Sequence, residues 1–265
     1  MRRFHAQFQH ALSEIPRRVR QTRDLAERVV AERLRTAPPR QEFGLPKATV
    51  VPNANYAPWS TDAEFLDAFD RIRDLTVVDV YRCYELWTLI RQLGPIDGDV
   101  LEVGVWRGGT GILLGRAAER FLSSCTVHLC DTFSGVVNAG PQDPYYRGGE
   151  FSNTSLEAVQ RAVAANGLGD RVRIHHGMFP EQTGTALQAQ DQFRLAHIDV
   201  DVYESARRTF EWVWPRLASG GAIVFDDYGF VDCAGVAVLV DREIASHVDG
   251  LVLHNLNGHA IVIKR

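Results

Sequence analysis

The chain has 265 residues, of which 45% are hydrophobic and 23% charged, a composition typical of a soluble globular protein with one main domain and room for an appendage. Its formal net charge of -4 gives no reason to expect a nucleic-acid partner, and no apolar run is long enough for a membrane span or a signal-peptide core. The four cysteines lack CxxC spacing, which argues against a zinc knuckle or a disulfide framework. We therefore expect a cytoplasmic protein with neither a nucleic-acid nor a membrane partner.

Residues 1–60 are predicted to form an N-terminal helical arm followed by a lid-like linker. Up to about Arg35 the segment is rich in arginine, and its apolar residues recur at roughly helical intervals, which predicts one or two amphipathic helices broken near Pro16. Interspersed acidic residues argue against a targeting presequence. We expect the arm to pack on a partner subunit, which would make a homo-oligomer, or on the main domain. A flexible arm is the alternative.

The linker includes the proline-rich stretch from Ala37 to Pro46 and continues as extended chain to Trp59. Tyr56 and Trp59 are candidates to stack on a ligand as part of a lid. A linker docked on the surface of the domain fits the sequence equally well.

The main domain, residues 61–265, is predicted to begin with two helices. Thr61 or Ser60 would cap the first helix, and Glu64 would complete a capping box. The second helix is predicted from about Val78 to Leu93, because a Gly-Pro pair follows it.

The stretch from Asp99 to Gly111 is predicted to be a buried strand and a glycine turn, which lead into a helix ending near Phe121. The strand residues are mostly β-branched or aliphatic, as in a strand covered on both faces. Gly104 and Gly108 allow the turn to approach a ligand closely. Glu102 interrupts the apolar run, and a carboxylate there needs a cation, a backbone N–H or a ligand hydroxyl as its partner.

This strand, turn and helix form the unit that opens nucleotide-binding Rossmann-like sheets, in which the ligand lies at the helix N-terminus. The chain departs from the dinucleotide fingerprint Gly-x-Gly-x-x-Gly, because Trp106 and Arg107 stand where a turn around pyrophosphate needs small residues. The departure favours S-adenosylmethionine over NAD as the ligand. A structural turn without a ligand is the third reading.

A second strand, from Thr126 to Cys130, is followed by Asp131. An acidic side chain at this place in a doubly wound sheet accepts hydrogen bonds from the ribose hydroxyls of an adenosine ligand, and an exposed aspartate that opens the next turn is the alternative. The segment from Thr132 to Phe151 is long and rich in glycine and proline, and we interpret it as a loop on the substrate side.

A helix from Ser155 to Asn166 and a third strand, from Val172 to Gly177, come next. The end of this strand would place Met178 and Phe179, together with Gly177, beside the adenine. We expect His175 and His176 to be ordinary strand residues, because neither has a second ligand at a suitable spacing.

Two later strands, beginning at Phe193 and Gly221, each end in two aspartates. The helix between them, from Tyr203 to Leu217, predicts a right-handed crossover, so the strands should be parallel neighbours. Their carboxyl ends would then bring four carboxylates to one edge of the sheet, those of Asp199, Asp201, Asp226 and Asp227.

Clustered carboxylates repel one another unless a cation or protons compensate, and ligands that are all oxygen select Mg²⁺ or Ca²⁺ over zinc. We therefore predict that Asp199, Asp226 and Asp227 are metal ligands and that Asp201 caps the following helix or supports the ligands. The alternative is that Asp201 is only a cap and Asp227 is exposed in a turn.

The tail is predicted to contain a helix from about Val231 to His247 and then two short apolar strands around Asn257-Gly258, a strong hairpin signal. A terminal antiparallel hairpin is unlike the dinucleotide dehydrogenases and is found in class I methyltransferases. The predicted fold class is therefore α/β: a Rossmann-like class I methyltransferase with a seven-stranded, mostly parallel sheet, a C-terminal antiparallel hairpin and an N-terminal helical extension.

Four motifs together closely resemble macrocin O-methyltransferase and its relatives, which act on the sugars of macrolide and aminocoumarin antibiotics; the motifs span residues 102–109, 131–135, 197–205 and 220–229. The resemblance covers the chain from about Val77 to the C-terminus. It implies methyl transfer from S-adenosylmethionine, dependent on Mg²⁺, to a hydroxyl of a sugar or other natural product, such as a glycosylated or polyketide-type acceptor.

Carried over by motif, Asp199 is similar to the position of the general base, and Asp199, Asp226 and Asp227 resemble the Mg²⁺ ligands. Gly104 and Asp131 match the cofactor contacts. No histidine base is identifiable, so activation of the hydroxyl by the metal carries more of the expected mechanism. The full set predicted to contact the cofactor is Glu102, Gly104, Trp106, Gly108, Asp131, Thr132, Gly177, Met178, Phe179 and Asp199.

Two functions of other classes are weighed against this prediction. An NAD-dependent oxidoreductase is disfavoured by the glycine spacing and the terminal hairpin. A noncatalytic cofactor-binding scaffold subunit is suggested only by the long basic N-terminal helix.

Overall fold

The computed structural model of the chain describes residues 17–187 and 192–265 and divides into two compact units, Met1–Tyr56 and Ala57–Arg265. The part of the predicted N-terminal helix that precedes residue 17 lies outside the described residues.

The first unit contains the helix α2 (Arg17–Thr36) and the short strands β1 (Arg40–Glu42) and β2 (Leu45–Lys47). The helix confirms the amphipathic pattern over its described length. The segment predicted as a linker contains a short antiparallel hairpin, in which β1 pairs with β2. Phe43 and Gly44 form its turn with φ angles of 51° and 78°, a left-handed conformation that composition alone did not reveal.

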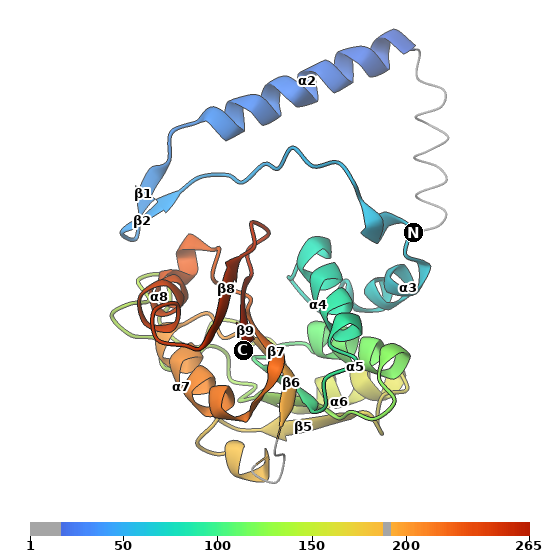
Figure 1. The fold of residues 1–265 in the computed structure, drawn as a ribbon, viewed down its shortest axis with the longest axis vertical. Coiled ribbons are helices and arrows are strands. Elements are labelled where there is room, and N and C mark those ends of the chain that lie inside the picture. Colours follow the sequence, from blue (N-terminus) through green and yellow to red (C-terminus); the bar gives the residue numbers. More distant parts are fainter. Residues whose placement is uncertain (1–16, 188–191) are drawn as a thin grey trace. The chain divides into compact units, whose positions relative to one another are not determined.

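The second unit is built on a seven-stranded sheet in the order β5-β4-β3-β6-β7-β9-β8 (Figure 1). The strands are β3 (Asp99–Val103), β4 (Val127–Asp131), β5 (Val172–His176), β6 (Phe193–Ile198), β7 (Leu217–Phe225), β8 (Gly250–His254) and β9 (Ala260–Lys264). The first five strands in this order are parallel, and β9 inserts antiparallel between β7 and β8. The predicted class I methyltransferase topology, with its terminal hairpin, is confirmed.

Helices cover both faces of this sheet (Figure 1). They are α3 (Ala63–Ile72), α4 (Val80–Gln92), α5 (Gly109–Phe121), α6 (Leu156–Ala165), α7 (Tyr203–Val213) and α8 (Ala234–Val238). Short 3-10 turns lie at Pro58–Ser60, Gly184–Leu187, Trp214–Arg216 and Val231–Cys233, and a π-helical segment follows α8 at Leu239–Ile244. None of the helices in the described part of the chain is long and apolar enough to cross a membrane.

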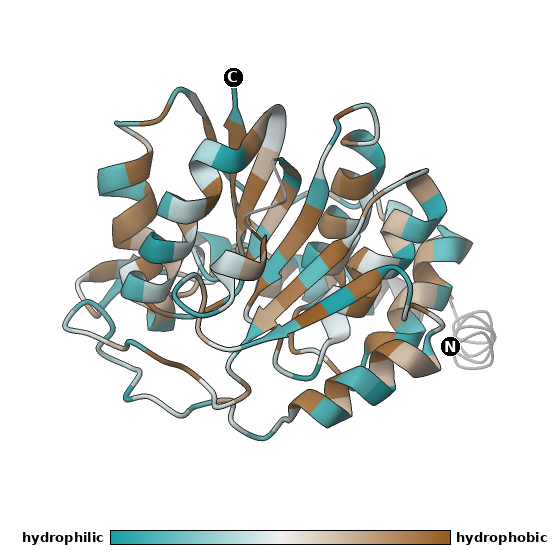
Figure 2. Ribbon diagram, turned by 90° about the horizontal axis from the view of Figure 1, so that it is seen from below, coloured by the Kyte–Doolittle hydropathy of each residue, from teal (hydrophilic) through white to brown (hydrophobic). Residues whose placement is uncertain are grey.

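Successive side chains of the strands point to opposite faces of the sheet and pack into two apolar cores, one on each face. Val100 and Leu195 lie in the core formed with α3, α4, α5 and α6, whereas their neighbours Leu101 and Ala196 lie in the core formed with α7 and α8. Figure 2 shows the apolar strands in the middle of this unit. Burial on both faces explains the near-continuous apolar runs that identified these strands in the sequence.

Three local details differ from the sequence predictions. The N-cap of α3 is Asp62, whose carboxylate accepts a hydrogen bond from the Phe65 N–H at 3.0 Å, rather than Thr61 or Ser60. The predicted tail helix is broken into the 3-10, α and π segments given above. Trp59 packs edge-to-face on Tyr81 and Tyr84 of the α4 region, at ring-centroid distances of 4.9 and 6.4 Å, so it is a core-flanking residue.

Candidate active site

A cavity of about 320 Å³ opens at the carboxyl ends of β3, β4, β6 and β7. Its size is in the range of small-molecule binding sites. It is lined by all the residues predicted to contact a cofactor except Glu102 and Gly108, and by the three predicted metal ligands. The parallel sheet makes this possible, because it brings the ends of strands that are far apart in sequence to a single edge.

The turn after β3 can be formed only with glycine at position 104. Gly104 has a φ angle of 88°, and a Cβ atom there would lie 1.7 Å from the backbone oxygen of Asp199. The turn after β3 therefore packs directly on the turn after β6, and the missing side chain is what allows the two strand ends to share one cavity.

Asp131, at the end of β4, stabilises the glycine turn through hydrogen bonds to its backbone. One carboxylate oxygen accepts hydrogen bonds from the backbone N–H groups of Val105 and Trp106 at 2.6 and 2.9 Å, and the other accepts one from Phe133 at 2.6 Å. The side chain also lines the cavity next to Thr132. Asp131 thus has a structural role that the sequence did not predict, in addition to its place beside the ligand space.

Trp106 lines the cavity and is anchored on the opposite side. Its indole N–H donates to the side-chain oxygen of Asn153 at 2.7 Å, its backbone oxygen accepts from the Thr154 hydroxyl, and the ring of Phe151 packs edge-on at 5.9 Å. The residue has a φ angle of 46°, a strained value for a tryptophan that these contacts stabilise. A large residue in the turn therefore shapes the cavity wall.

Gly177, Met178 and Phe179 follow β5 and form another part of the wall. The Met178 N–H donates to Gln182 at 2.7 Å, and the ring of Phe179 packs edge-on against Trp212 at 5.0 Å. These contacts hold the segment beside the cavity, where an adenine ring was predicted.

Glu102 and Gly108 are not part of the cavity wall. Glu102 is fully buried, and its carboxylate pairs with Nδ1 of His197 at 3.0 Å, so the partner that it requires is a histidine rather than a ligand hydroxyl. Gly108 is the N-cap of α5, and a Cβ atom there would lie 3.0 Å from Val159, behind the turn. Of the ten residues predicted to contact the cofactor, these two therefore lie outside the cavity lining.

Asp199, Asp226 and Asp227 each offer an oxygen within 4.8 Å of the others. Burial and the negative charge of Asp226 raise the pKa of Asp199 well above its usual range. Burial and the charge of Asp199 do the same for the pKa of Asp227. Such a cluster needs protons or a cation for neutrality, and an all-oxygen donor set fits a hard divalent cation.

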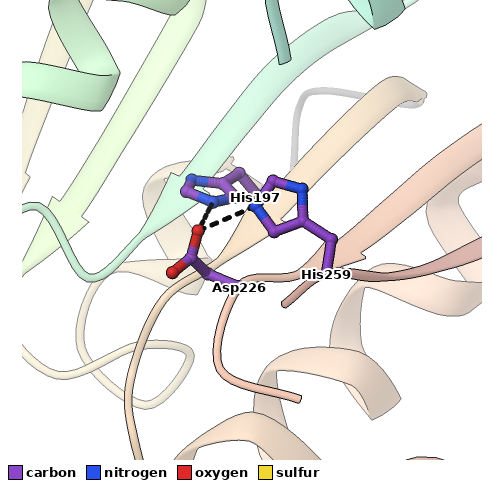
Figure 3. Close-up of side chains that lie close together, drawn as sticks. All are labelled: His197, Asp226 and His259. Atoms are coloured by element: carbon purple, nitrogen blue, oxygen red, sulfur yellow. Dashed lines mark hydrogen bonds and ion pairs between the residues drawn. The ribbon is translucent and has the colours of Figure 1, made fainter. Parts of the chain in front are cut away.

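Asp226 is held by three donors, of which Figure 3 shows two, His197 and His259. One oxygen accepts hydrogen bonds from Nε2 of His259 at 2.8 Å and Nε2 of His197 at 3.3 Å, and the other oxygen forms an ion pair with Arg82. Although burial acts in the opposite direction, the hydrogen bonds from the two histidines and the charges around Asp226 hold its pKa below the usual range. Hydrogen bonds to Asp226 and Glu102 likewise overcome burial and raise the pKa of His197 to about 10.

Asp201 does not cap α7, as one prediction had it. The N-cap of α7 is Val202, without a side-chain hydrogen bond, and Asp201 has a φ angle of 66°. Its carboxylate accepts a hydrogen bond from the Tyr146 hydroxyl at 2.5 Å, and burial together with the charge of Asp227 raises its pKa to about 8. Asp201 therefore connects the long loop between β4 and α6 to the acidic edge of the sheet.

Sequence reasoning missed four residues that complete the site: Arg82, Tyr146, Cys233 and His259. All four are buried, and each contacts a carboxylate of the site or of its surroundings. They lie on α4, in the loop between β4 and α6, just before α8 and on the terminal hairpin. A charged residue on the buried face of a predicted helix, or a histidine at the start of an apolar strand, is a weak signal that a polar partner lies opposite. His175 and His176 lie in β5, as predicted, and His175 pairs with His128 rather than with the acidic cluster.

A profile of the family described as macrocin-O-methyltransferase matches residues 75–247. The chain is also similar to demethyldecarbamoylnovobiocin O-methyltransferase of Streptomyces niveus, with 32% identity over 50% of this chain and 53% of that protein. It is 33% identical to 8-demethyl-8-(2,3-dimethoxy-alpha-L-rhamnosyl)-tetracenomycin-C 4'-O-methyltransferase of Streptomyces olivaceus over 52% of this chain and 56% of that protein. The chain thus matches about half the length of these curated relatives.

Solved structures agree on the fold. The O-methyltransferase NovP superposes with a TM-score of 0.63 and 23% identity, covering 72% of this chain and 82% of that one. The calicheamicin methyltransferase CalS11 superposes with a TM-score of 0.60 and 16% identity, covering 79% of this chain and 94% of that one.

Proposed function

Because the chain belongs to the macrocin O-methyltransferase family, we propose that it transfers a methyl group from S-adenosylmethionine to a hydroxyl of a sugar or other natural product and requires Mg²⁺. One observation carries this proposal. The glycine turn with Asp131 and the cluster of Asp199, Asp226 and Asp227 line the same cavity. A donor bound at the turn and an acceptor bound at the acidic edge would therefore be neighbours.

On the donor side, we assign the adenosine part of S-adenosylmethionine to the wall formed by Trp106, Asp131, Thr132 and Met178. The Asp131 carboxylate already accepts hydrogen bonds from three backbone N–H groups, which hold it rigidly. The one remaining lone pair, on Oδ1, would accept a hydrogen bond from a ribose hydroxyl. The absence of a side chain at Gly104 leaves room for close approach at the strand end. Bound S-adenosylmethionine supplies the electrophilic methyl group, and the cavity aligns it.

On the acceptor side, Asp199, Asp226 and Asp227 would hold Mg²⁺. When bound, the cation lowers the pKa of the acceptor hydroxyl. Asp199 is our candidate general base, because it lines the cavity at the edge where the acceptor hydroxyl would lie. The Asp199 carboxylate would take the hydroxyl proton as the acceptor oxygen forms its bond to the methyl carbon. The bond between that carbon and the sulfonium sulfur would break at the same time, which leaves S-adenosylhomocysteine.

The chemical class of the acceptor is proposed from the relatives, one of which is named for a rhamnosyl-bearing acceptor. Tyr146, Phe230 and Asp232 line the part of the cavity near the acidic edge. Aromatic faces and polar groups of this kind suit a sugar ring, which offers both C–H surfaces and hydroxyls. We also propose that the enzyme is cytoplasmic, with residues 1–60 as an arm that joins copies of the chain.

Thermal unfolding provides the first test. The midpoint would be measured with S-adenosylmethionine or NAD, each in Mg²⁺ and in EDTA, since a ligand at about a hundred times its dissociation constant stabilises a protein by about 2.7 kcal/mol. We expect a rise with S-adenosylmethionine and a separate or larger rise with Mg²⁺. A rise with NAD alone would favour the oxidoreductase. Cofactor binding without methyl transfer to any of a panel of glycosylated acceptors would favour the noncatalytic subunit.

A further inference from the structure

Asp226 is the centre of a buried group of charged side chains, which we call the Asp226 cluster. Its members are Arg82, Glu85, Glu102, His197, Asp226 and His259. Both histidines and Glu102 are fully buried. Burying so many charged groups costs free energy of folding unless each one is paired in good geometry. We therefore ask what function the cluster serves.

Each histidine bridges two carboxylates. His197 contacts Glu102 through Nδ1 at 3.0 Å and Asp226 through Nε2 at 3.3 Å. His259 contacts Glu85 through Nδ1 at 2.5 Å and Asp226 through Nε2 at 2.8 Å. An ionised carboxylate can only accept hydrogen bonds, so Nε2 of each ring is the donor toward the Asp226 carboxylate.

The two histidines reach Asp226 from separate elements. His197 lies on β6, and His259 immediately precedes β9 in the terminal hairpin. Asn257 of the same hairpin also donates to Glu85 of α4, at 3.2 Å. Asp226 is therefore held by hydrogen bonds from both the middle of the sheet and the hairpin. The hairpin is in turn bonded to Glu85 of α4.

The cluster distinguishes the two oxygens of Asp226. Both histidines contact Oδ1, and neither histidine lines the cavity. Arg82 contacts Oδ2, and Arg82 does line the cavity. Oδ2 is therefore the oxygen on the cavity side, and rotation of the carboxylate would break two charge-assisted hydrogen bonds.

We infer that His197 and His259 are positioning residues, which hold Oδ1 of Asp226 so that Oδ2 is presented to the divalent cation. The inference rests on the proposed function, since it assigns a role in that same metal site. Partners that orient a metal ligand typically change metal affinity or activity by about 10–100-fold when they are removed. The terminal hairpin is thus part of the metal site and not only the edge of the sheet.

The test is a calorimetric titration of MgCl₂ into the full chain, with S-adenosylmethionine titrated separately. We expect His259→Phe to weaken Mg²⁺ binding by about 10–100-fold and to leave the S-adenosylmethionine dissociation constant unchanged. His259→Gln keeps an N–H donor near the Nε2 position and should restore most of the Mg²⁺ affinity. Glu85→Gln should weaken Mg²⁺ binding less than His259→Phe, and should have no further effect when combined with it.

His128→Phe is the matched control, because His128 is also buried and paired with a carboxylate, that of Asp99 at 3.1 Å, away from the cavity. Circular dichroism at the titration temperature would confirm that every variant is folded. Equal Mg²⁺ affinity in the wild type and His259→Phe, or the same loss in His128→Phe, would overturn the inference and leave the proposed function standing. A wild-type chain that binds S-adenosylmethionine but no Mg²⁺ would overturn both the inference and the metal part of the proposed function.

Discussion

At the residue scale, the site depends on individual carboxylates that differ in their surroundings. Asp226 accepts hydrogen bonds from two histidines and pairs with Arg82, whereas Asp131 accepts hydrogen bonds from three backbone N–H groups. The pKa of Asp199 is governed mainly by burial and by the charges of its neighbours. These aspartates thus have different roles, because each carboxylate has a different set of hydrogen-bond and charge partners.

We expect Asp199→Asn to lower kcat by at least about 10²-fold, because the amide keeps the shape of the side chain and cannot accept the hydroxyl proton. Binding of S-adenosylmethionine should persist. The measurement is steady-state kinetics together with calorimetric titration of the cofactor. Asp241→Asn is a suitable control, since Asp241 pairs with Tyr228 at 2.8 Å and does not line the cavity. Full activity in Asp199→Asn would exclude Asp199 as the base.

Gly104→Ala should destabilise the protein more than Gly149→Ala does. The two glycines have nearly equal φ angles, 88° and 89°, so an alanine suffers about the same backbone strain, about 1–2 kcal/mol, at either position. A Cβ at position 104 meets the Asp199 backbone at 1.7 Å, whereas one at position 149 has nothing within 4 Å. Urea unfolding would measure the difference, and equal losses would show that close approach of the two turns is unimportant.

At the element scale, buried polar contacts attach the long loop between β4 and α6 to the site. Asp143 of the loop accepts a hydrogen bond from the Tyr203 N–H at 2.9 Å, and the Tyr146 hydroxyl reaches the acidic edge of the sheet. The Tyr146 ring is buried, and its hydroxyl contacts Asp201 at 2.5 Å and Cys233 at 3.5 Å. The loop has no helix or strand of its own between residues 132 and 151, so side-chain contacts of this kind determine its position.

Tyr146→Phe should cost about 1–3 kcal/mol of unfolding free energy, because it leaves the buried Asp201 carboxylate without this hydrogen bond. We also expect faster proteolytic cleavage within residues 132–151. The neighbouring Tyr145 is 55% exposed, and Tyr145→Phe is therefore the matched control with little expected effect. Urea unfolding and limited proteolysis would compare the two variants. Identical behaviour would mean that the Tyr146 hydroxyl does not hold the loop.

At the scale of the whole molecule, the chain consists of a compact sheet domain, which holds the entire candidate site, and a separate N-terminal unit. The described part of α2 exposes Leu25, Val29, Val30 and Leu34, which recur at helical spacing. An apolar stripe of this kind suits association with another helix.

A chain that begins at Ala57 should therefore keep the unfolding midpoint and S-adenosylmethionine binding of the full chain, because the lining of the cavity lies wholly within that unit. We expect the full chain to self-associate and the shortened chain to be monomeric. Light scattering after size-exclusion chromatography would measure both masses. If the two chains have the same oligomeric state, the proposed role of the arm is wrong.

Patterns in the sequence were enough to predict the sheet domain, the edge of the sheet that bears the candidate site and most of the cavity wall. Strands buried on both faces leave continuous apolar runs, the turn at Gly104 leaves glycines, and the carboxyl ends of parallel strands must meet at one edge. Asp131, Asp199, Asp226 and Asp227 were therefore placed together without coordinates. The apolar runs and the glycines are local sequence patterns, and the shared edge follows from the topology of a parallel sheet.

The partner of each buried polar side chain could be identified only from the folded chain. Glu102 was expected to touch a ligand and instead pairs with His197, and Asp226 is held by Arg82 and His259, which lie 144 and 33 residues away in the chain. A buried charge requires some partner, but the sequence does not say which one, because pairing depends on distances across the core between elements that have no local relation.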